Sequence, residues 1–484
     1  MNKKLTGLFL GAGASYEAGL PVVWELTGEI RDWLTPEKLR ELNKGWRSQG
    51  TGCSDEVIED FVSVLVMPDA HYENMLGYLE TQYRRKRERQ NEYRLLYSWM
   101  VELVYVLLCQ RQIKNDVFLR RKIGYFEGIR FMAEENTPLW VFSLNHDVVI
   151  EAIAAHYSIP INFGFSDEQV SLPCRGANGK VKGRLNAQVL RRDTLDNCAM
   201  FFPNPAVEGI YLLKLHGALD VFAFNDGADL LKLMPVGEGF EGVTEALRAV
   251  NEDVFFPEPA SPNGRANIMN EIAYADDEGV MQFLRRSLLA GAFKFSDANT
   301  QVLPKSLLKH FRANINFLSK LVCVGYGFGD NHINVIIREW LEFSDSRSLE
   351  VVGPAASVPA FLMHVAPQVT VVQMVATDYF DLVAGVTRPR CDELDKKVSA
   401  VVRSRGRAQA KADLAAFGKQ ESERYKQLHI ESLARIYEDG KGTAVGDVLK
   451  EYVPIAVDDE EATLERMLSF IEARVKESEA GRKA

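Results

Sequence analysis

A glycine-rich turn near the N-terminus has the residue types and spacing of a phosphate-binding loop. The apolar run LFL at 8–10 is followed by GAGASYEAGLP at 11–21. An apolar segment that changes into glycines and then into polar residues is typical of a strand, a tight turn and a helix start. In that arrangement the backbone N–H groups of Gly11 and Gly13 contact a pyrophosphate at a helix N-terminus, and Ser15 adds a hydroxyl. The alternative is a tight turn that binds no ligand.

The spacing of the turn departs from that of a hydride-transfer enzyme. The dehydrogenase pattern G-x-G-x-x-G requires a glycine where this chain has Tyr16, and the next glycine is Gly19. The pattern G-A-G-x-S-x-x-x-G-L-P describes the stretch better. Its candidate nucleotide-binding residues are Gly11, Ala12, Gly13, Ser15, Gly19 and Pro21.

Two further polar stretches follow buried-strand patterns. PLWVFSLN at 138–145 leads into Asn145 and Asp147, and IYLLKL at 210–215 leads into His216. Residues two apart on a strand point the same way, and the carboxyl ends of parallel strands line a ligand crevice. An imidazole also titrates near physiological pH, which suits proton transfer. The structural alternatives are that Asn145 and Asp147 cap the next helix and that His216 is a hydrogen-bonded structural residue.

The fourth stretch, GYGFGDNHIN at 325–334, places glycines and polar residues after the run KLVCV. The glycines allow close approach of a ribose or phosphate, and capping and turn formation are the alternative roles of the polar residues. The candidates are Gly325, Tyr326, Gly327, Asp330, His332 and Asn334. His216, His332 and Asp330 together resemble a metal triad, but their spacing is not that of a zinc motif, so we expect no metal.

These four stretches, in this order, resemble the sirtuins, specifically the sirtuin-like NADase domains of bacterial anti-phage defence proteins. They frame about residues 5–375. The resemblance implies that Asn145 orients a water or the nicotinamide ribose, that Asp147 fixes the nicotinamide amide or its loop, and that His216 is the catalytic base. Sirtuin deacylases carry a zinc module of two C-x-x-C pairs, and this chain has none. Its absence disfavours deacylation.

The resemblance implies a hydrolase that cleaves NAD+ into nicotinamide and ADP-ribose, with NAD+ as substrate, in an abortive-infection response. Such an enzyme needs control, so we expect a homo-oligomer and a partner such as a HerA-like ATPase or another defence-system sensor protein. A non-catalytic module that binds NAD+ or ADP-ribose is one alternative. A nuclease subunit is another, with the basic run YRRKRERQ at 83–90 as its thin support. A solvated helix face explains that run as well.

Composition limits the other classes of protein. The chain has 484 residues, 46% of them hydrophobic, and a net charge of −10. This charge disfavours a protein that coats nucleic acid. The six cysteines form no C-x-x-C pair, which argues against a disulfide framework and suits the cytoplasm. The apolar run at 95–109 contains Glu102 and is shorter than the roughly 20 residues of a membrane span. We expect a buried helix there and no membrane contact.

The order of patterns predicts an α/β fold with a doubly wound, Rossmann-like parallel sheet of the sirtuin type. Residues 22–130 read as a mostly helical insertion into a domain at 1–385. We expect long loops over the crevice at 160–209 and 222–265, because both are rich in Gly, Pro, Asn and Asp. The sequence of residues 386–484 predicts a helical C-terminal region, which we expect to serve in partner docking or oligomerisation.

Overall fold

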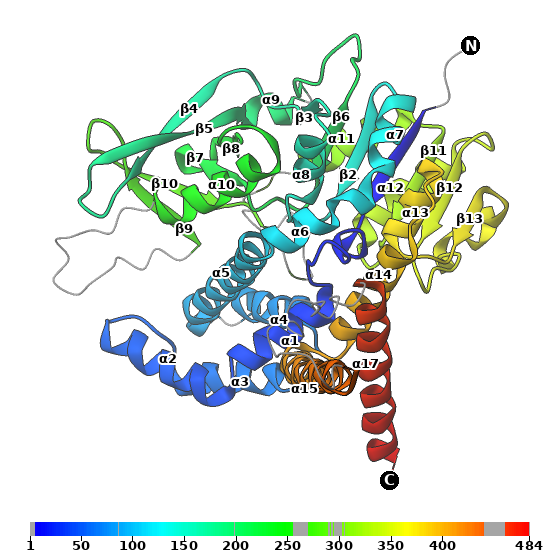
Figure 1. The fold of residues 1–484 in the computed structure, drawn as a ribbon. Coiled ribbons are helices and arrows are strands. Elements are labelled where there is room, and N and C mark those ends of the chain that lie inside the picture. Colours follow the sequence, from blue (N-terminus) through cyan, green and yellow to red (C-terminus); the bar gives the residue numbers. More distant parts are fainter. Residues whose placement is uncertain are drawn as a thin grey trace. The chain divides into compact units, whose positions relative to one another are not determined.

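The computed structural model of the chain describes residues 5–85, 87–197, 199–254, 270–288, 291, 294, 303, 305–439 and 460–483. The chain divides into two compact units, Met1–Gly385 and Val386–Ala484 (Figure 1). The larger unit contains two sheets and the helical insertion.

A seven-stranded parallel sheet forms the centre of the larger unit, in the order β13-β12-β11-β1-β2-β6-β3. The strands buried on both faces are nearly continuous apolar runs, as parallel sheets require. The predicted α/β fold with a doubly wound parallel sheet is confirmed. The bounds are β1 Thr6–Leu10, β2 Leu139–Ser143, β3 Ile161–Asn162, β6 Ile210–Lys214, β11 Lys320–Val324, β12 Ser348–Val352 and β13 Val369–Val372.

The strand order reverses beside β1. From β1 the chain adds β2 and β6 on one side, and later adds β11, β12 and β13 on the other. Leu10 is level with Val324 of β11 and with Ser143 of β2, so the polar stretches after these strands begin at the same height. Such a reversal leaves a crevice at the carboxyl ends, where α/β proteins bind ligands.

Helices cover both faces of the parallel sheet (Figure 1). Alternate residues of β1 face different cores: Leu8 and Leu10 pack with α7 (Gly128–Glu135), α8 (Val149–His156) and α13 (Ala376–Ala384). Phe9 packs with α11 (Ser306–Asn314) and α12 (Asn331–Glu342). This alternation follows from the two-residue period of a strand. Buried on both faces, β1 is fixed in position and register.

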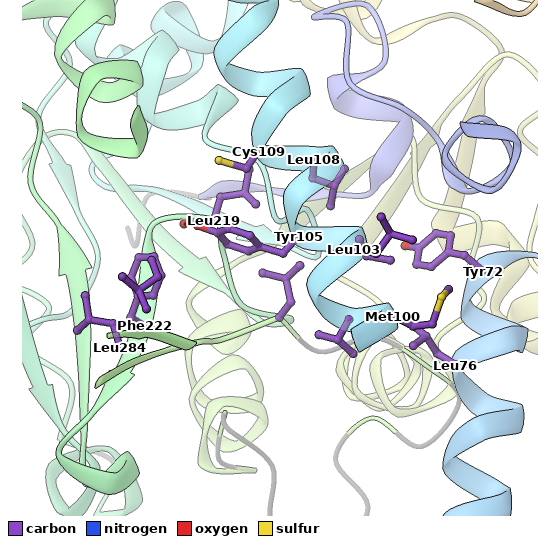
Figure 2. Close-up of a cluster of buried hydrophobic side chains, with 14 of the residues drawn as sticks. Tyr72, Leu76, Met100, Leu103, Tyr105, Leu108, Cys109, Leu219, Phe222 and Leu284 are labelled. Carbon is purple, nitrogen blue, oxygen red and sulfur yellow. Dashed lines mark hydrogen bonds between the residues drawn. The ribbon is translucent and has the colours of Figure 1, made fainter. Parts of the chain in front are cut away.

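The predicted helical insertion is confirmed, because helices occupy most of the chain between β1 and β2. They are α1 Val23–Trp33, α2 Pro36–Ser48, α3 Asp55–Leu65, α4 Tyr72–Arg85, α5 Gln90–Lys114, α6 Asp116–Lys122 and α7. The run at 95–109 is a buried part of α5, as expected. Figure 2 shows α5 between α4 and a second sheet: Tyr105 packs near Phe222 and donates its hydroxyl to the carbonyl of Leu219 at 3.0 Å.

The prediction of long loops at 160–209 and 222–265 is wrong for most of the described residues. The stretch 199–209 does lack helix and strand, as predicted, and residues 255–265 lie outside the described part. A six-stranded antiparallel sheet occurs instead, in the order β4-β5-β8-β7-β10-β9. Its glycine-rich stretch at 176–179 is a hairpin turn, whereas Leu185, Ala187 and Val189 alternate with more exposed residues along β5. The bounds are β4 Gln169–Arg175, β5 Val181–Arg191, β7 Val221–Phe224, β8 Asp229–Leu233, β9 Glu271–Ala275 and β10 Met281–Arg286, with helices α9 Arg192–Asp196 and α10 Gly239–Glu252.

The smaller unit is helical in its described residues. It contains α14 Arg390–Ser404, α15 Arg407–Asp439 and α17 Glu460–Lys483. Leu394 and Val398 of α14 pack against Leu464 of α17. The buried carboxylate of Asp413 accepts hydrogen bonds from Arg405 and Arg474 at 2.8 and 2.7 Å. No helix within the described residues of either unit is long and apolar enough to cross a membrane.

Candidate functional site

A cavity of about 610 Å³ opens at the carboxyl ends of β1, β2, β6 and β11. Its volume falls within the roughly 300–1,000 Å³ of typical ligand pockets. All four stretches singled out in the sequence contribute to it, together with α1 and α4. The lining residues are Gly11, Ala12, Leu20, Pro21, Val23, Trp24, Leu26, His71, Tyr72, Glu73, Asn74, Leu108, Leu144, Asn145, His146, Asp147, His216, Gly291, Lys294, Gly325, Tyr326, Gly327, Gly329, Asp330, Asn331 and His332.

Most of the predicted site residues therefore line one cavity. The exceptions are Gly13, Ser15, Gly19 and Asn334, which are not among its lining residues. Asn334 holds the turn after β11: its Nδ2 donates to the carbonyl of Phe328 at 2.8 Å, and its Oδ1 accepts from the Tyr326 hydroxyl at 3.0 Å. Asn334 therefore forms part of the turn, which was the alternative to its contacting a ligand.

The glycine turn contacts protein through the N–H groups expected to contact a ligand. Gly11 N–H donates to the carbonyl of Val324, and Gly13 N–H donates to the carbonyl of Gly325, each at 3.0 Å. The turn continues as a short 3-10 helix at Ala12–Ser15, and the first α-helix begins only at Val23. Both N–H groups therefore have protein partners in this structure, and their contact with a pyrophosphate stays a prediction.

The glycines of the turn are explained by this close approach of two loops. Gly325 has φ +63°, in the left-handed region, and an added Cβ would lie 2.3 Å from the Ala14 nitrogen and 2.5 Å from the Gly13 Cα. Gly327 has open space where its Cβ would be. Between these two positions, the backbone therefore requires glycine at Gly325 but not at Gly327.

Asn145 links the second strand to the glycine turn. Its Nδ2 donates to the carbonyl of Gly11 at 2.9 Å and to the Ser15 hydroxyl at 3.0 Å. Both amide protons are thereby engaged, and the described residues form no hydrogen bond to Oδ1. Asn145 is 8% exposed and lines the cavity. It does not cap α8, and Oδ1 is the acceptor it offers to a ligand or water.

Asp147 has the capping role that was the structural alternative. Its Oδ1 accepts the Val149 N–H at 3.1 Å at the start of α8. Burial raises the pKa of the Asp147 carboxyl, while Lys214 and the Ser15 hydroxyl oppose that rise. The carboxylate therefore fixes the loop as well as lining the cavity.

The buried ammonium of Lys214 holds the loop that carries Asn145 and Asp147. The Lys214 ammonium donates to the carbonyls of Asn145, at 3.4 Å, and Asp147, and lies 3.4 Å from the Glu151 carboxylate. Glu151 in turn accepts from Lys232 at 2.9 Å. These charges are nearly inaccessible to solvent, so each one depends on its partners. Sequence reasoning missed Lys214, although it lies within the run IYLLKL at 210–215 that leads into His216.

His216 is buried, and its imidazole contacts the imidazole of a second histidine. Its Nε2 lies 3.2 Å from Nε2 of His332. Burial lowers the pKa of His216 well below 6.5, and the Lys294 ammonium lowers it further. Burial also lowers the pKa values of His146 and His332 to about 4. The three imidazoles are therefore neutral at pH 7.

A charged group lies beside the two histidines. The Lys294 ammonium is 2.9 Å from Glu73 of α4 and 3.2 Å from Asp330, which precedes α12. Asp330 occupies the N-cap position of α12, but its side chain makes no capping hydrogen bond. Side-chain capping, which was the alternative to ligand binding for Asp330, does not occur in this structure.

Several cavity residues had no signal in the sequence. Trp24 and His71 come from α1 and from the residue before α4, and their rings meet edge to face with centroids 5.5 Å apart. The sequence of that region shows only packing periodicity, which does not reveal which turn faces a ligand. His146 lies between Asn145 and Asp147, so its position after a strand could have identified it.

The comparisons with known proteins add little to this geometry. No family model matches the chain and no curated protein matches it. Among solved structures, a mutant Sir2 homologue in complex with 2'-O-acetyl ADP ribose is 10% identical to this chain, with a TM-score of 0.35. The match covers 78% of this chain and 90% of the homologue's chain. A mutant Sir2 homologue in complex with ADP ribose has a TM-score of 0.34, with the same identity and coverage. Likenesses this low carry no argument about activity or ligand.

Replacing Gly325 should test the contact between the two loops. We expect Gly325→Ala to lower the free energy of unfolding by about 2 kcal/mol or more, because it adds left-handed backbone strain and a clash with Ala14. Gly327→Ala is the matched control and should unfold like the wild type. Urea denaturation followed by tryptophan fluorescence measures both. Equal stability of the two variants would contradict the close approach of the loops.

Proposed function

We propose that the chain is an NAD+ glycohydrolase, which releases nicotinamide and ADP-ribose. The observation that carries the proposal is that Asn145 and His216, from neighbouring parallel strands, line one ligand-sized cavity at the point where the strand order reverses. The resemblance of the four sequence stretches to sirtuin-like NADase domains assigns those residues to the reacting ribose. Their contacts in the structure are compatible with these roles.

The reaction requires little covalent help from the protein. The nicotinamide of NAD+ is a cationic leaving group, so the enzyme has to bind it, stabilise an oxocarbenium-like ribose and deliver water to one face. Asn145 offers the carbonyl Oδ1, which accepts a hydrogen bond from that water or from a ribose hydroxyl. His216 is neutral and can accept a proton. Asp147 and Lys214 keep the Asn145 loop in place.

The rest of the cavity fits the remaining parts of NAD+. The N–H groups of Gly11 and Gly13 have protein partners in this structure, and the Lys294 ammonium, which lines the cavity, is already paired with two carboxylates. Trp24 is 53% exposed and lines the cavity, and we propose that its ring stacks with a base or a nicotinamide ring. The helical insertion thereby supplies binding residues that the sheet alone lacks.

We place this activity in bacterial anti-phage defence, where loss of NAD+ stops an infected cell. An enzyme of this kind needs a trigger, and we propose that the helical unit at 386–484 docks a HerA-like ATPase, another sensor protein or a second copy of the chain. Its described helices pack through a small apolar cluster and carry many charged residues. Cytoplasmic location and homo-oligomeric assembly belong to the same proposal.

Removal of either reacting-site side chain should abolish turnover. We expect Asn145→Ala and His216→Ala to reduce NAD+ cleavage on the order of 100-fold or more, because each loses a hydrogen bond made mainly in the transition state. The measurement is a time course of NAD+ loss and of nicotinamide and ADP-ribose formation. His364→Ala is the control, since His364 is exposed, pairs with Glu342 and is not among the residues that line the cavity.

Near-normal turnover by either folded variant would contradict the assigned roles. If the wild type binds NAD+ or ADP-ribose tightly but cleaves nothing, even with candidate partners present, the site is a binding module instead. DNA cleavage that disappears when Arg84 and Arg85 are replaced would instead indicate a nuclease subunit.

The pH dependence should reflect the buried state of His216. Its pKa lies well below 6.5, so the neutral base is present above that pH and is lost only as the pH falls toward the lowered pKa. We expect kcat/KM to change by no more than about twofold between pH 6.5 and 8. A pH series in buffers of constant ionic strength measures it. An acid limb with an apparent pKa near 6.5 to 7 would contradict a buried neutral base.

A further inference from the structure

The strongest unassigned feature of the cavity is a cluster of three metal-ligating side chains. Ligand atoms of His216, His332 and Asp330 all lie within 4.8 Å of one another. The two histidines are 116 residues apart in the chain: His216 follows β6, and His332 lies in the first turn of α12. No local spacing pattern exists for such a set, so the expectation of no metal depended on evidence that could not detect this site.

The distance between the two imidazoles fits a shared metal ion. Two Zn–N bonds of about 2.0–2.1 Å at a tetrahedral angle place the nitrogens roughly 3.3 Å apart. The observed Nε2 to Nε2 distance is 3.2 Å. At this distance one hydrogen bond between the rings is the competing arrangement, and a divalent ion would replace its proton.

The charges around the cluster also favour a cation. Glu73 and Asp330 contribute two carboxylates and Lys294 contributes one ammonium, all within ion-pair distance. The carboxylates therefore outnumber the ammonium before any ion binds. Lys294 contacts Asp330 through Oδ1, and the described residues form no hydrogen bond to Oδ2. One carboxylate oxygen can thus meet a metal while the other keeps its ion pair, an arrangement typical of outer-shell support.

We propose that His216, His332 and Asp330 form a binding site for a divalent transition metal of the Zn2+ class. Two imidazoles and one carboxylate are the ligands of several catalytic zinc sites, which leave a further position for water. The cavity that these residues line supplies an entry path and room for that water.

The metal and the NAD+ reaction would exclude each other at His216. A metal ion on Nε2 takes the lone pair that the proposed base uses to accept a proton. Bound Zn2+ should therefore inhibit NAD+ cleavage, and this consequence rests on the proposed function. The binding of the metal itself does not.

The first test measures Zn2+ binding without using activity. Chelator-treated full-length protein is titrated with Zn2+ by calorimetry, and Co2+ is added in a parallel sample to record its visible absorption. We expect one ion per chain, and Co2+ absorption in the range typical of nitrogen and oxygen ligands. His332→Ala and Asp330→Asn should each weaken binding on the order of 100-fold, at least as much as loss of an outer-shell partner costs.

Matched controls separate this site from adventitious binding. His364→Ala removes a surface histidine that pairs with Glu342 at 2.6 Å and should leave the affinity unchanged. Thermal unfolding without metal checks that each variant folds, and His332→Gln replaces His332→Ala if the latter does not. Binding that His332 and Asp330 variants leave unchanged, or no binding to folded wild type, would overturn the proposal.

The outcome for the metal is distinguishable from the outcome for the enzyme. If the protein binds Zn2+ through the three residues and cleaves no NAD+, the metal site stands and the proposed function fails. If it cleaves NAD+ and binds no Zn2+, the proposed function stands and the metal site fails. Inhibition by Zn2+ that a chelator reverses would support both.

Discussion

The site depends on the contact between the glycine turn after β1 and the loop after β11. Two backbone hydrogen bonds join them, from Gly11 to Val324 and from Gly13 to Gly325, and Gly325 adopts a left-handed conformation to make this approach. Asn145 then attaches the end of β2 to the same turn through Gly11 and Ser15. Because the N–H groups of Gly11 and Gly13 bond to protein carbonyls, contact with a ligand is left to the side chains around the turn.

Buried charges give this arrangement its second constraint. Lys214 and Lys232 share the carboxylate of Glu151 beneath the loop that carries Asn145 and Asp147. Desolvating such groups is costly, and breaking one pair leaves the others uncompensated. These pairs therefore hold the loop in place, which keeps the Asn145 amide oriented toward the cavity.

The parallel sheet could be predicted from the sequence because each of its strands longer than two residues is an apolar run that ends at a Gly, Asn or other turn residue. The antiparallel sheet could not, since its strands alternate and are separated by the same residues that mark loops, as in β5. Four stretches correctly pointed to one cavity. The other residues of the cavity could not be predicted, because Glu73, His71 and Lys294 reach it only through tertiary packing. Nor could the sequence show that the Gly13 N–H bonds to the carbonyl of Gly325, far along the chain.

The position of β1 has a consequence for how the protein is made. This strand is the first of the chain, yet one of its two neighbours is β11, so Thr6 pairs with Lys320. Contacts so distant in sequence form slowly and late. During synthesis β1 and β2 are both made long before β11, so the pairing of β1 with β11 cannot form until the intervening residues have been added. The cavity is completed only when His332 has left the ribosome, so a nascent chain lacks the site until most of the larger unit exists.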